Sequence, residues 1–208
     1  MFEPAFTLLG SPVSWLELFA FVLTVAMVIC NVHEIHWGWP LSLVASLLYA
    51  RLFFEHQLYG ETGINLVFAL AALWGWWQWL FGRAQRVEDL LAAPKGALGI
   101  ARLPRGLRLG ALAFWLIGWF VLGQFLARET DSDVPWADAF VTAGSMLGLT
   151  LTGRKFIENW PVWFVVNVAS VVLFIYKALF LTALLYTLLA VMALWGWQSW
   201  RARAGLGK

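Results

Sequence analysis

The sequence predicts an all-α integral membrane protein whose seven transmembrane helices form two related three-helix units joined by a linker helix. Three observations lead to this fold class: an apolar composition, a series of membrane-length apolar segments, and a tryptophan pattern that recurs after 121 residues. Of the 208 residues, 62% are hydrophobic and 12% charged, whereas roughly 25% of residues are charged in ordinary soluble domains. A water-exposed domain of this size could not bury so much apolar surface.

Seven apolar segments are long enough to cross a hydrocarbon core of roughly 30 Å, which requires about 20 helical residues. They cover residues 14–32, 39–56, 62–81, 110–127, 135–152, 160–178 and 180–200. The N-terminal residues carry Glu3 but no Lys or Arg up to Gly10. A cleaved signal peptide has a basic N-terminal region, so we expect the first span to be retained. Cys30 is the only cysteine, which excludes an intrachain disulfide.

The Lys and Arg residues predict the orientation in the membrane, because cytoplasmic loops retain positive charge. Eleven of the fourteen follow the third, fifth and seventh spans, namely Arg83, Arg86, Lys95, Arg102, Arg105, Arg108, Arg154, Lys155, Arg201, Arg203 and Lys208. Acidic residues gather at the opposite ends of the spans. We therefore expect an outer N-terminus and a cytoplasmic C-terminus. This orientation also accounts for the basic run 83–108, so no nucleic-acid partner is expected.

An internal repeat relates the two halves of the chain. An ungapped overlay of residues 13–79 on 134–200 gives 16 identities in 67 positions, including five aligned tryptophan pairs. We predict a first three-helix repeat at 13–81, a basic loop and linker helix at 82–133, a second repeat at 134–200 and a cytoplasmic tail at 201–208. Because each repeat has an odd number of spans, the linker helix at 110–127 restores a parallel orientation. This 3+1+3 arrangement is the one known from SWEET-type sugar transporters.

Polar side chains inside the spans are the first candidates for a ligand pathway. Tyr49 and Asn65 lie in the first repeat, and Asn167 and Tyr186 lie in the second. Parallel repeats place such a pathway on their pseudo-symmetry axis near the bilayer midplane. An unpaired amide in hydrocarbon costs several kcal/mol, so these groups face either a polar pathway or a neighbouring helix. The sequence leaves both roles open.

The start of the sixth span combines aromatic rings with an amide. Trp160, Trp163 and Asn167 are spaced by three and four residues, which places them on one helical face. Pro161 suits the first turn of that helix. Indole rings and a two-way hydrogen-bonding amide fit a planar heteroaromatic ligand, and a cationic one in particular. Simple packing of the tryptophans is the alternative interpretation.

The same segment resembles a known family. Residues Gly153-Arg-Lys-Phe-Ile-Glu-Asn-Trp-Pro-Val-Trp163, followed by Asn167, Tyr176-Lys177 and Leu181-Thr-Ala-Leu-Leu-Tyr186, are similar to the second half of the PnuC family of bacterial vitamin transporters. The first half is similar through Trp37-Gly-Trp-Pro40 and Leu58-Tyr-Gly60. The resemblance covers the whole chain at the level of the seven spans.

The resemblance implies facilitated diffusion of nicotinamide riboside through the bacterial inner membrane for NAD biosynthesis. A cytoplasmic kinase would trap the vitamin, the transporter would be a homotrimer, and neither a cofactor nor enzymatic activity is expected. Together with the polar residues inside the spans, the resemblance gives the following candidate substrate-binding residues: Trp160, Trp163, Asn167, Tyr186, Tyr49, Asn65, Asn159, Lys177 and Trp37. Many members carry a Trp-Leu pair where this chain has Leu149-Thr-Leu-Thr152. Thiamine and riboflavin therefore remain alternative substrates.

Other functional classes are less well supported. The segment His33-Glu-Ile-His36 contains metal-ligand residue types, but its histidines are three apart instead of the four required on a zinc-protease helix. The chain has neither a phosphate-binding lysine motif nor a serine nucleophile elbow. Glu17 and Asp138 occupy equivalent repeat positions, where first-turn helix stabilisation competes with a proton-coupling site. A membrane structural or receptor protein is the alternative outside transport.

Overall fold

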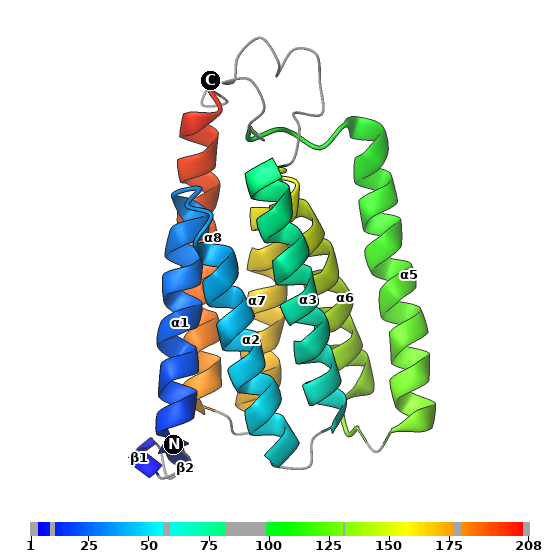
Figure 1. Ribbon diagram of the computed structural model, residues 1–208. Coiled ribbons are helices and arrows are strands. Elements are labelled where there is room, and N and C mark those ends of the chain that lie inside the picture. The colour runs from blue at the N-terminus through cyan, green and yellow to red at the C-terminus, as the bar shows by residue number, and fades with distance from the viewer. Residues whose placement is uncertain are drawn as a thin grey trace. The chain divides into compact units, whose positions relative to one another are not determined.

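The computed structural model describes residues 4–8, 11–55, 59–81, 99–130, 132–176 and 180–205, most of which are helical (Figure 1). The chain divides into two compact units, Met1–Gly99 and Ile100–Lys208. The first contains the strands β1 (Pro4–Leu8) and β2 (Ser11–Ser14) and the helices α1 (Trp15–Val32), α2 (Gly38–Glu55) and α3 (Tyr59–Phe81). The second contains α5 (Arg105–Glu129), α6 (Pro135–Gly153), α7 (Asn159–Tyr176) and α8 (Phe180–Arg203).

These helices confirm the all-α architecture and lie at the seven predicted spans. The antiparallel β1–β2 hairpin was not predicted, because it is only nine residues of mixed character. It leads directly into α1, where the Ser14 hydroxyl accepts a hydrogen bond from the Glu17 backbone N–H at 3.2 Å. Glu17 and Asp138 both lie in first helical turns. Asp138 accepts a hydrogen bond from the Ser132 hydroxyl at 3.0 Å.

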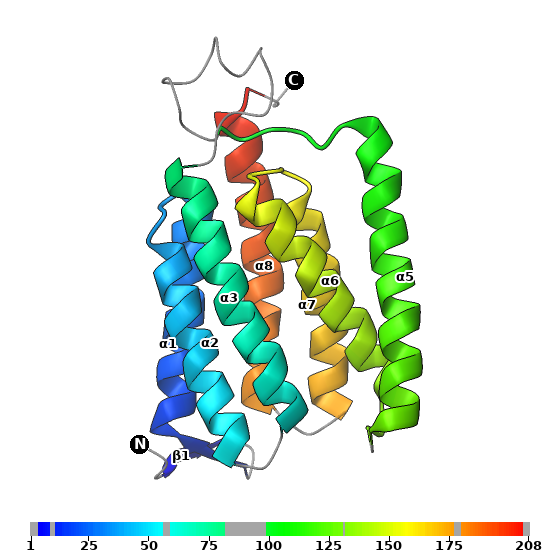
Figure 2. The same cartoon turned by 45° about the vertical axis from the view of Figure 1, so that its right-hand side comes forward.

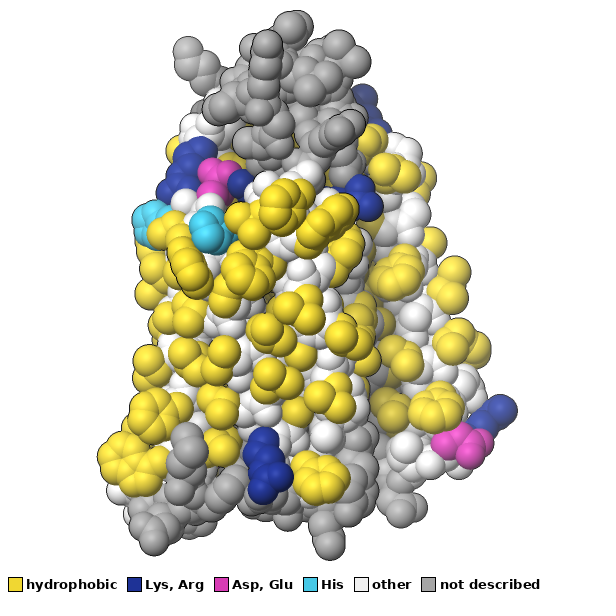
Figure 3. Space-filling view, viewed as in Figure 1, with side chains coloured by type: hydrophobic (Ala, Val, Ile, Leu, Met, Phe, Trp, Pro, Cys, Tyr) yellow, Lys and Arg dark blue, Asp and Glu magenta, His cyan; other side chains and the backbone are white. Residues whose placement is uncertain are grey.

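Hydrophobic side chains cover the outer faces of the helices. Leu70, Leu109 and Val172 are each about two-thirds or more exposed, at 66%, 74% and 67%. In the space-filling view such side chains line the helices along their length, whereas charged and histidine side chains lie near the ends (Figure 3). Apolar exposure on this scale is unfavourable in water. The protein is therefore a multi-pass membrane protein surrounded by lipid.

Five of the described helices combine the length and composition needed to cross a membrane: α1, α3 from Thr62 onward, α5, α7 and α8. The sequence predicted seven such spans. Helices α2 and α6 are long enough, at 18 and 19 residues, but are less apolar than the other five. In α6 the reason is contact with α5 and α7. Nine of its residues are buried, among them Gly144, Ser145, Gly148 and Thr152. Small and hydroxyl-bearing residues suit close helix packing inside a membrane.

The linker helix is longer than predicted and belongs to the second unit. It was expected at 110–127 and runs over Arg105–Glu129. The indole N–H of Trp115 donates to the carbonyl of Phe140 at 3.0 Å, and that of Trp119 donates to the carbonyl of Trp136 at 2.8 Å. These two bonds attach α5 to α6, and the two helices lie side by side (Figure 2).

The turns after α1 and α6 have the same backbone geometry 121 residues apart. Glu34 and Lys155 both adopt positive φ, at 58° and 52°, which is uncommon for non-glycine residues. Five backbone hydrogen bonds recur at matching positions in the two turns. In the first turn, written from the N–H donor to the C=O acceptor, they join residues 33 to 29, 34 to 31, 35 to 30, 38 to 35 and 39 to 36. In the second turn they join residues 154 to 150, 155 to 152, 156 to 151, 159 to 156 and 160 to 157.

Matching tryptophans also lie on matching glycines in the two units. In α2, Trp39 lies over Gly75 of α3 and meets the Trp79 ring edge to face at 5.7 Å. In α7, Trp160 lies over Gly196 of α8 and meets Trp200 edge to face at 5.4 Å. Trp39 and Trp160 are 2% and 3% exposed. Each glycine lets its helix approach an indole ring at a distance that a Cβ would prevent.

Gly196→Ala is expected to destabilise the protein, because the new Cβ would overlap the Trp160 ring, which cannot move without disturbing Trp200. Overpacking a core typically costs about 1–3 kcal/mol. The measurement is the thermal midpoint of the detergent-purified protein. Gly110→Ala is the matched control, since nothing lies within 4 Å of its added Cβ. An unchanged midpoint in Gly196→Ala would contradict the packing argument.

Candidate functional site

Buried polar groups of the second unit concentrate on α7. Asn159, Asn167 and Ser170 are 0%, 4% and 0% exposed. Among the described residues of Ile100–Lys208, the buried side-chain atoms without a hydrogen-bond partner are Asn159 Oδ1, Trp160 Nε1 and Ser170 Oγ, and all three belong to this helix. Leaving a buried polar group unpaired costs about 1–3 kcal/mol. Trp39, the counterpart of Trp160 in the first unit, also has an unpaired Nε1, so Asn159 Oδ1 and Ser170 Oγ are the unpaired atoms that the repeat does not account for.

Asn159 begins α7 and stabilises the preceding turn. Its amide Nδ2 donates to the carbonyl of Phe156 at 2.7 Å. This bond fixes the side chain and leaves Oδ1 as the unpaired atom. Asn159 therefore has a structural role, and its substrate role stays a prediction.

A clamp on the same turn was not predicted from the sequence. Glu158 accepts a hydrogen bond from the Leu103 backbone N–H at 2.8 Å and forms an ion pair with Arg108 at 3.0 Å. Ala101 pairs with the turn as well, donating to Lys155 and accepting from Ile157. From the sequence, Arg108 was counted only among the basic residues that predict the cytoplasmic side of the membrane. The clamp fixes the segment before α5 against the start of α7.

Trp160 packs toward α8 and Trp163 packs toward α6. The Trp163 indole N–H donates to Thr152 Oγ1 at 3.0 Å, and the Thr152 hydroxyl donates to the Gly148 carbonyl at 2.8 Å. Gly148 also lies directly under the Trp163 ring, where a Cβ would be 2.8 Å away. The orientation of Trp163 is therefore determined by α6.

Asn167 lies between the two tryptophans around the helix. At about 100° per residue it is about 20° from Trp160 and about 40° from Trp163. Asn167 therefore lies on the face of α7 between the face that contacts α6 and the face that contacts α8. The sequence predicted that Trp160, Trp163 and Asn167 form one face, but the two indoles contact different helices. We call the α7 surface formed by Asn167 with Trp160 on one side and Trp163 on the other the wedge. Trp163, which is only partly buried, and Asn167 remain the best-placed pair for a ligand.

The other predicted residues are distributed over both units. Tyr186 contacts Phe174, with ring centroids 5.0 Å apart. Tyr49 and Asn65 belong to the first unit, are partly buried and are not free of interactions. Trp37 is 58% exposed, and its ring centroid lies 6.4 Å from that of Trp76. Lys177 lies outside the described residues.

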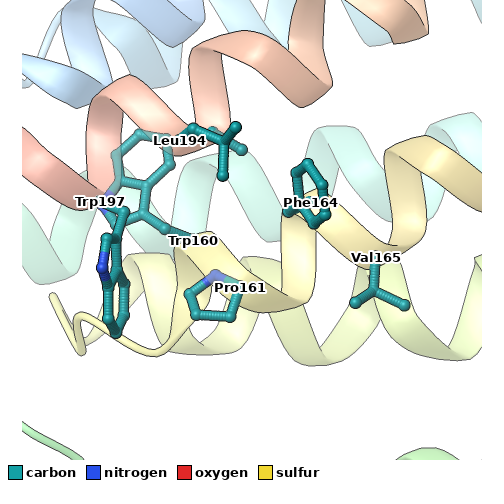
Figure 4. A pocket seen from close by; sticks show the side chains of 7 residues that line it. Trp160, Pro161, Phe164, Val165, Leu194 and Trp197 are labelled. Carbon is teal, nitrogen blue, oxygen red and sulfur yellow. The ribbon is translucent and has the colours of Figure 1, made fainter.

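A shallow groove between α7 and α8 is not a suitable vitamin site. Its volume is about 200 Å³, and it is lined by Trp160, Pro161, Phe164, Val165, Ala193, Leu194 and Trp197 (Figure 4). Pro161, Val165 and Leu194 are exposed on the surface of the unit. Vitamin sites combine apolar walls with placed polar groups, and this groove is almost wholly apolar. It is therefore an apolar depression on the surface of the second unit.

The histidine segment has a packing role. His36 Nδ1 accepts a hydrogen bond from the Trp76 indole N–H at 3.4 Å, and its ring lies 5.4 Å from that of Trp37. Within the part of the chain that the structure describes, no three His, Cys, Asp or Glu side chains gather into a possible metal site.

Comparison with known families identifies the chain. The family described as nicotinamide mononucleotide transporters matches residues 14–202, which include every helix except the last residue of α8. The chain belongs to this family, the PnuC family.

PnuC relatives of different named specificity are equally similar to the chain. The riboflavin/roseoflavin transporter RibM of Streptomyces davaonensis is 26% identical over 201 residues, covering 96% of this chain and 91% of RibM. The nicotinamide riboside transporter PnuC of Escherichia coli K12 is 26% identical over 215 residues, covering 92% of this chain and 87% of that protein. Sequence identity therefore does not separate the two specificities.

A solved PnuC structure has the same fold. The crystal structure of the vitamin B3 transporter PnuC matches with a TM-score of 0.72 at 20% identity, covering 90% of this chain and 81% of that one.

Thr152→Val is expected to release Trp163 in this PnuC-family chain, because valine keeps the volume but removes the hydroxyl that accepts the indole N–H. Freed from this bond, the indole should show altered fluorescence and faster acrylamide quenching. Thr187→Val is the matched control, since the Thr187 hydroxyl bonds only its own helix, at the Ala183 carbonyl. Equal quenching in wild type and Thr152→Val would show that the bond does not hold the ring.

Proposed function

We propose that the chain carries nicotinamide riboside into the bacterial cytoplasm by facilitated diffusion across the inner membrane. Membership of the PnuC family over residues 14–202 is the observation that carries the proposal. A specific observation favours riboflavin as the second candidate, since RibM is as similar as the nicotinamide riboside transporter and is covered more fully. Thiamine is the third.

The wedge on α7 supports this proposal chemically. A pyridinium ring stacked on the Trp163 indole would gain a cation–π interaction, which is strongest for tryptophan. The Asn167 amide can donate to and accept from the nicotinamide carboxamide. The uncharged flavin ring also has a donor and acceptor edge for Asn167 but would gain no cation–π energy. Trp163 is held for this role by its hydrogen bond to Thr152.

Two duplicated units suit alternating access to such a site. The recurrent turn hydrogen bonds and the two tryptophan-on-glycine contacts support a 3+1+3 duplication in which α5 restores the parallel orientation. Rocking of one repeat against the other would then open the pathway to either side. Phosphorylation by a cytoplasmic kinase would trap the vitamin inside, and the transporter would assemble as a homotrimer.

The proposed orientation places the N-terminus outside and the C-terminus in the cytoplasm. Arg201 and Arg203 in the last turn of α8 support this, since cytoplasmic ends retain positive charge. In a Cys30→Ala background, Ser132→Cys in intact cells should react with a membrane-impermeant maleimide. Arg203→Cys should react only after the cells are opened. The reverse labelling pattern would overturn the orientation.

Ligand binding tests the proposed function directly. Nicotinamide riboside should raise the thermal midpoint of the purified protein, because a ligand that binds only the folded state stabilises it by mass action. A midpoint raised by riboflavin or thiamine alone would replace the substrate. No shift with any of the three would favour the structural or receptor alternative, which also predicts no saturable uptake.

Trp163→Ala and Asn167→Ala should each remove at least nine-tenths of the nicotinamide riboside affinity, measured by titration calorimetry. Val172→Ala is the matched control on the same helix, because that side chain is 67% exposed to lipid. Amounts of protein in the membrane should be equal in all three. Wild-type affinity in both site variants would show that the substrate binds elsewhere.

A further inference from the structure

Ser170 carries an unexplained hydroxyl on α7. The residue is 0% exposed, and its Oγ has no hydrogen-bond partner among the described residues. An apolar alanine would avoid the cost of burying this group. A buried hydroxyl without a partner therefore requires an explanation.

Ser170 forms no hydrogen bond to its own helix, in contrast to four threonines of the described helices. Serine and threonine in helices commonly donate to the carbonyl four residues earlier. Four threonines do so at 2.8–2.9 Å: Thr24 to Ala20, Thr150 to Met146, Thr152 to Gly148 and Thr187 to Ala183. Ser170 has the Val166 carbonyl at the same spacing and does not use it. Its hydroxyl thus keeps its hydrogen-bonding capacity unused within the described part of the chain.

The position of Ser170 connects it with the wedge. It is one turn beyond Asn167 and two turns beyond Trp163, about 20° from Trp163 around the helix and about 10 Å further along it. A ligand with its ring at Trp163 and its polar edge at Asn167 would extend its remaining part along α7 toward Ser170.

Comparison of the two halves separates Trp163, Asn167 and Ser170 from the packing residues that both halves share. Trp160 and Gly196 have identical counterparts in Trp39 and Gly75. Trp163, Asn167 and Ser170 instead correspond to Ser42, Ser46 and Tyr49. Packing common to both units does not require these three residues. They are specific to the second unit, as expected for groups that recognise an asymmetric ligand.

We propose that Ser170 is a substrate-binding residue that hydrogen-bonds the hydroxylated five-carbon part of the vitamin, which is a ribose ring in one leading substrate and a ribityl chain in the other. This inference rests on the proposed function and holds for either leading substrate, because nicotinamide riboside carries a ribose and riboflavin carries a ribityl chain. Thiamine has no such chain. Ser170 thus selects for the polyol part of the ligand, while Trp163 and Asn167 bind the ring.

Ser170→Ala tests this division with paired ligands in titration calorimetry. The pairs are nicotinamide riboside with nicotinamide, and riboflavin with lumiflavin, whose ring carries a methyl group instead of the ribityl chain. The variant should bind the hydroxylated member about tenfold more weakly and the ring-only member with unchanged affinity. Ser145→Ala, a buried serine on α6 that is 6% exposed, is the matched control.

Unchanged affinity for the hydroxylated ligand, or an equal loss for both members of a pair, would overturn the role of Ser170. Ser170→Cys provides a second variant of nearly equal volume and weaker hydrogen bonding, should alanine impair folding, and the same selective loss is expected. If the wild type binds neither vitamin, the proposed function itself fails. If it binds one of them and Ser170→Ala binds it equally well, only this inference fails.

Discussion

Contact of an indole ring with a glycine backbone is the interaction on which each unit depends. Trp160 on Gly196 sets how closely α7 approaches α8, and Trp39 on Gly75 does the same for α2 and α3. Lipid offers no hydrophobic force to bring helices together, so association relies on such close van der Waals packing and on hydrogen bonds. With α7 held on α8 at one side and on α6 through Trp163 and Thr152 at the other, Asn167 lies in a defined wedge.

The similarity between the two halves separates residues with a common packing role from the candidate site. Residues identical in both units, such as the tryptophans and glycines of these contacts, perform the same packing twice. The turns before α2 and α7 share their hydrogen bonds although Glu34 and Lys155 differ, because backbone geometry determines them. Trp160, a candidate ligand residue by sequence, belongs with the scaffold by its packing. Its indole N–H is the only polar part left for a ligand.

Much of the fold could be predicted because hydropathy and helical length are properties of single segments. The seven helices lie where the apolar segments predicted them, but α5 begins earlier, and α2 and α6 are less apolar than a lipid-exposed span. The candidate site stays a prediction, in which the choice of Trp163 and Asn167 follows from their spacing on one helix. The roles of Thr152, Glu158 and Ser170 could not be foreseen, since each depends on a partner, or on the lack of one, in the folded chain.

By itself, the sequence determined that this is a membrane protein, that residues 13–79 and 134–200 are similar at a spacing of 121 residues, and that it resembles the PnuC family, because these features depend on local composition and order. Only the tertiary structure decided which neighbour each α7 side chain meets. Trp160 and Trp163 differ by about 60° around the helix, too little for periodicity to assign them to different neighbours. The positions of Gly148 and Gly196 decide it, because each of these glycines lets the backbone of a neighbouring helix contact one of the two indole rings.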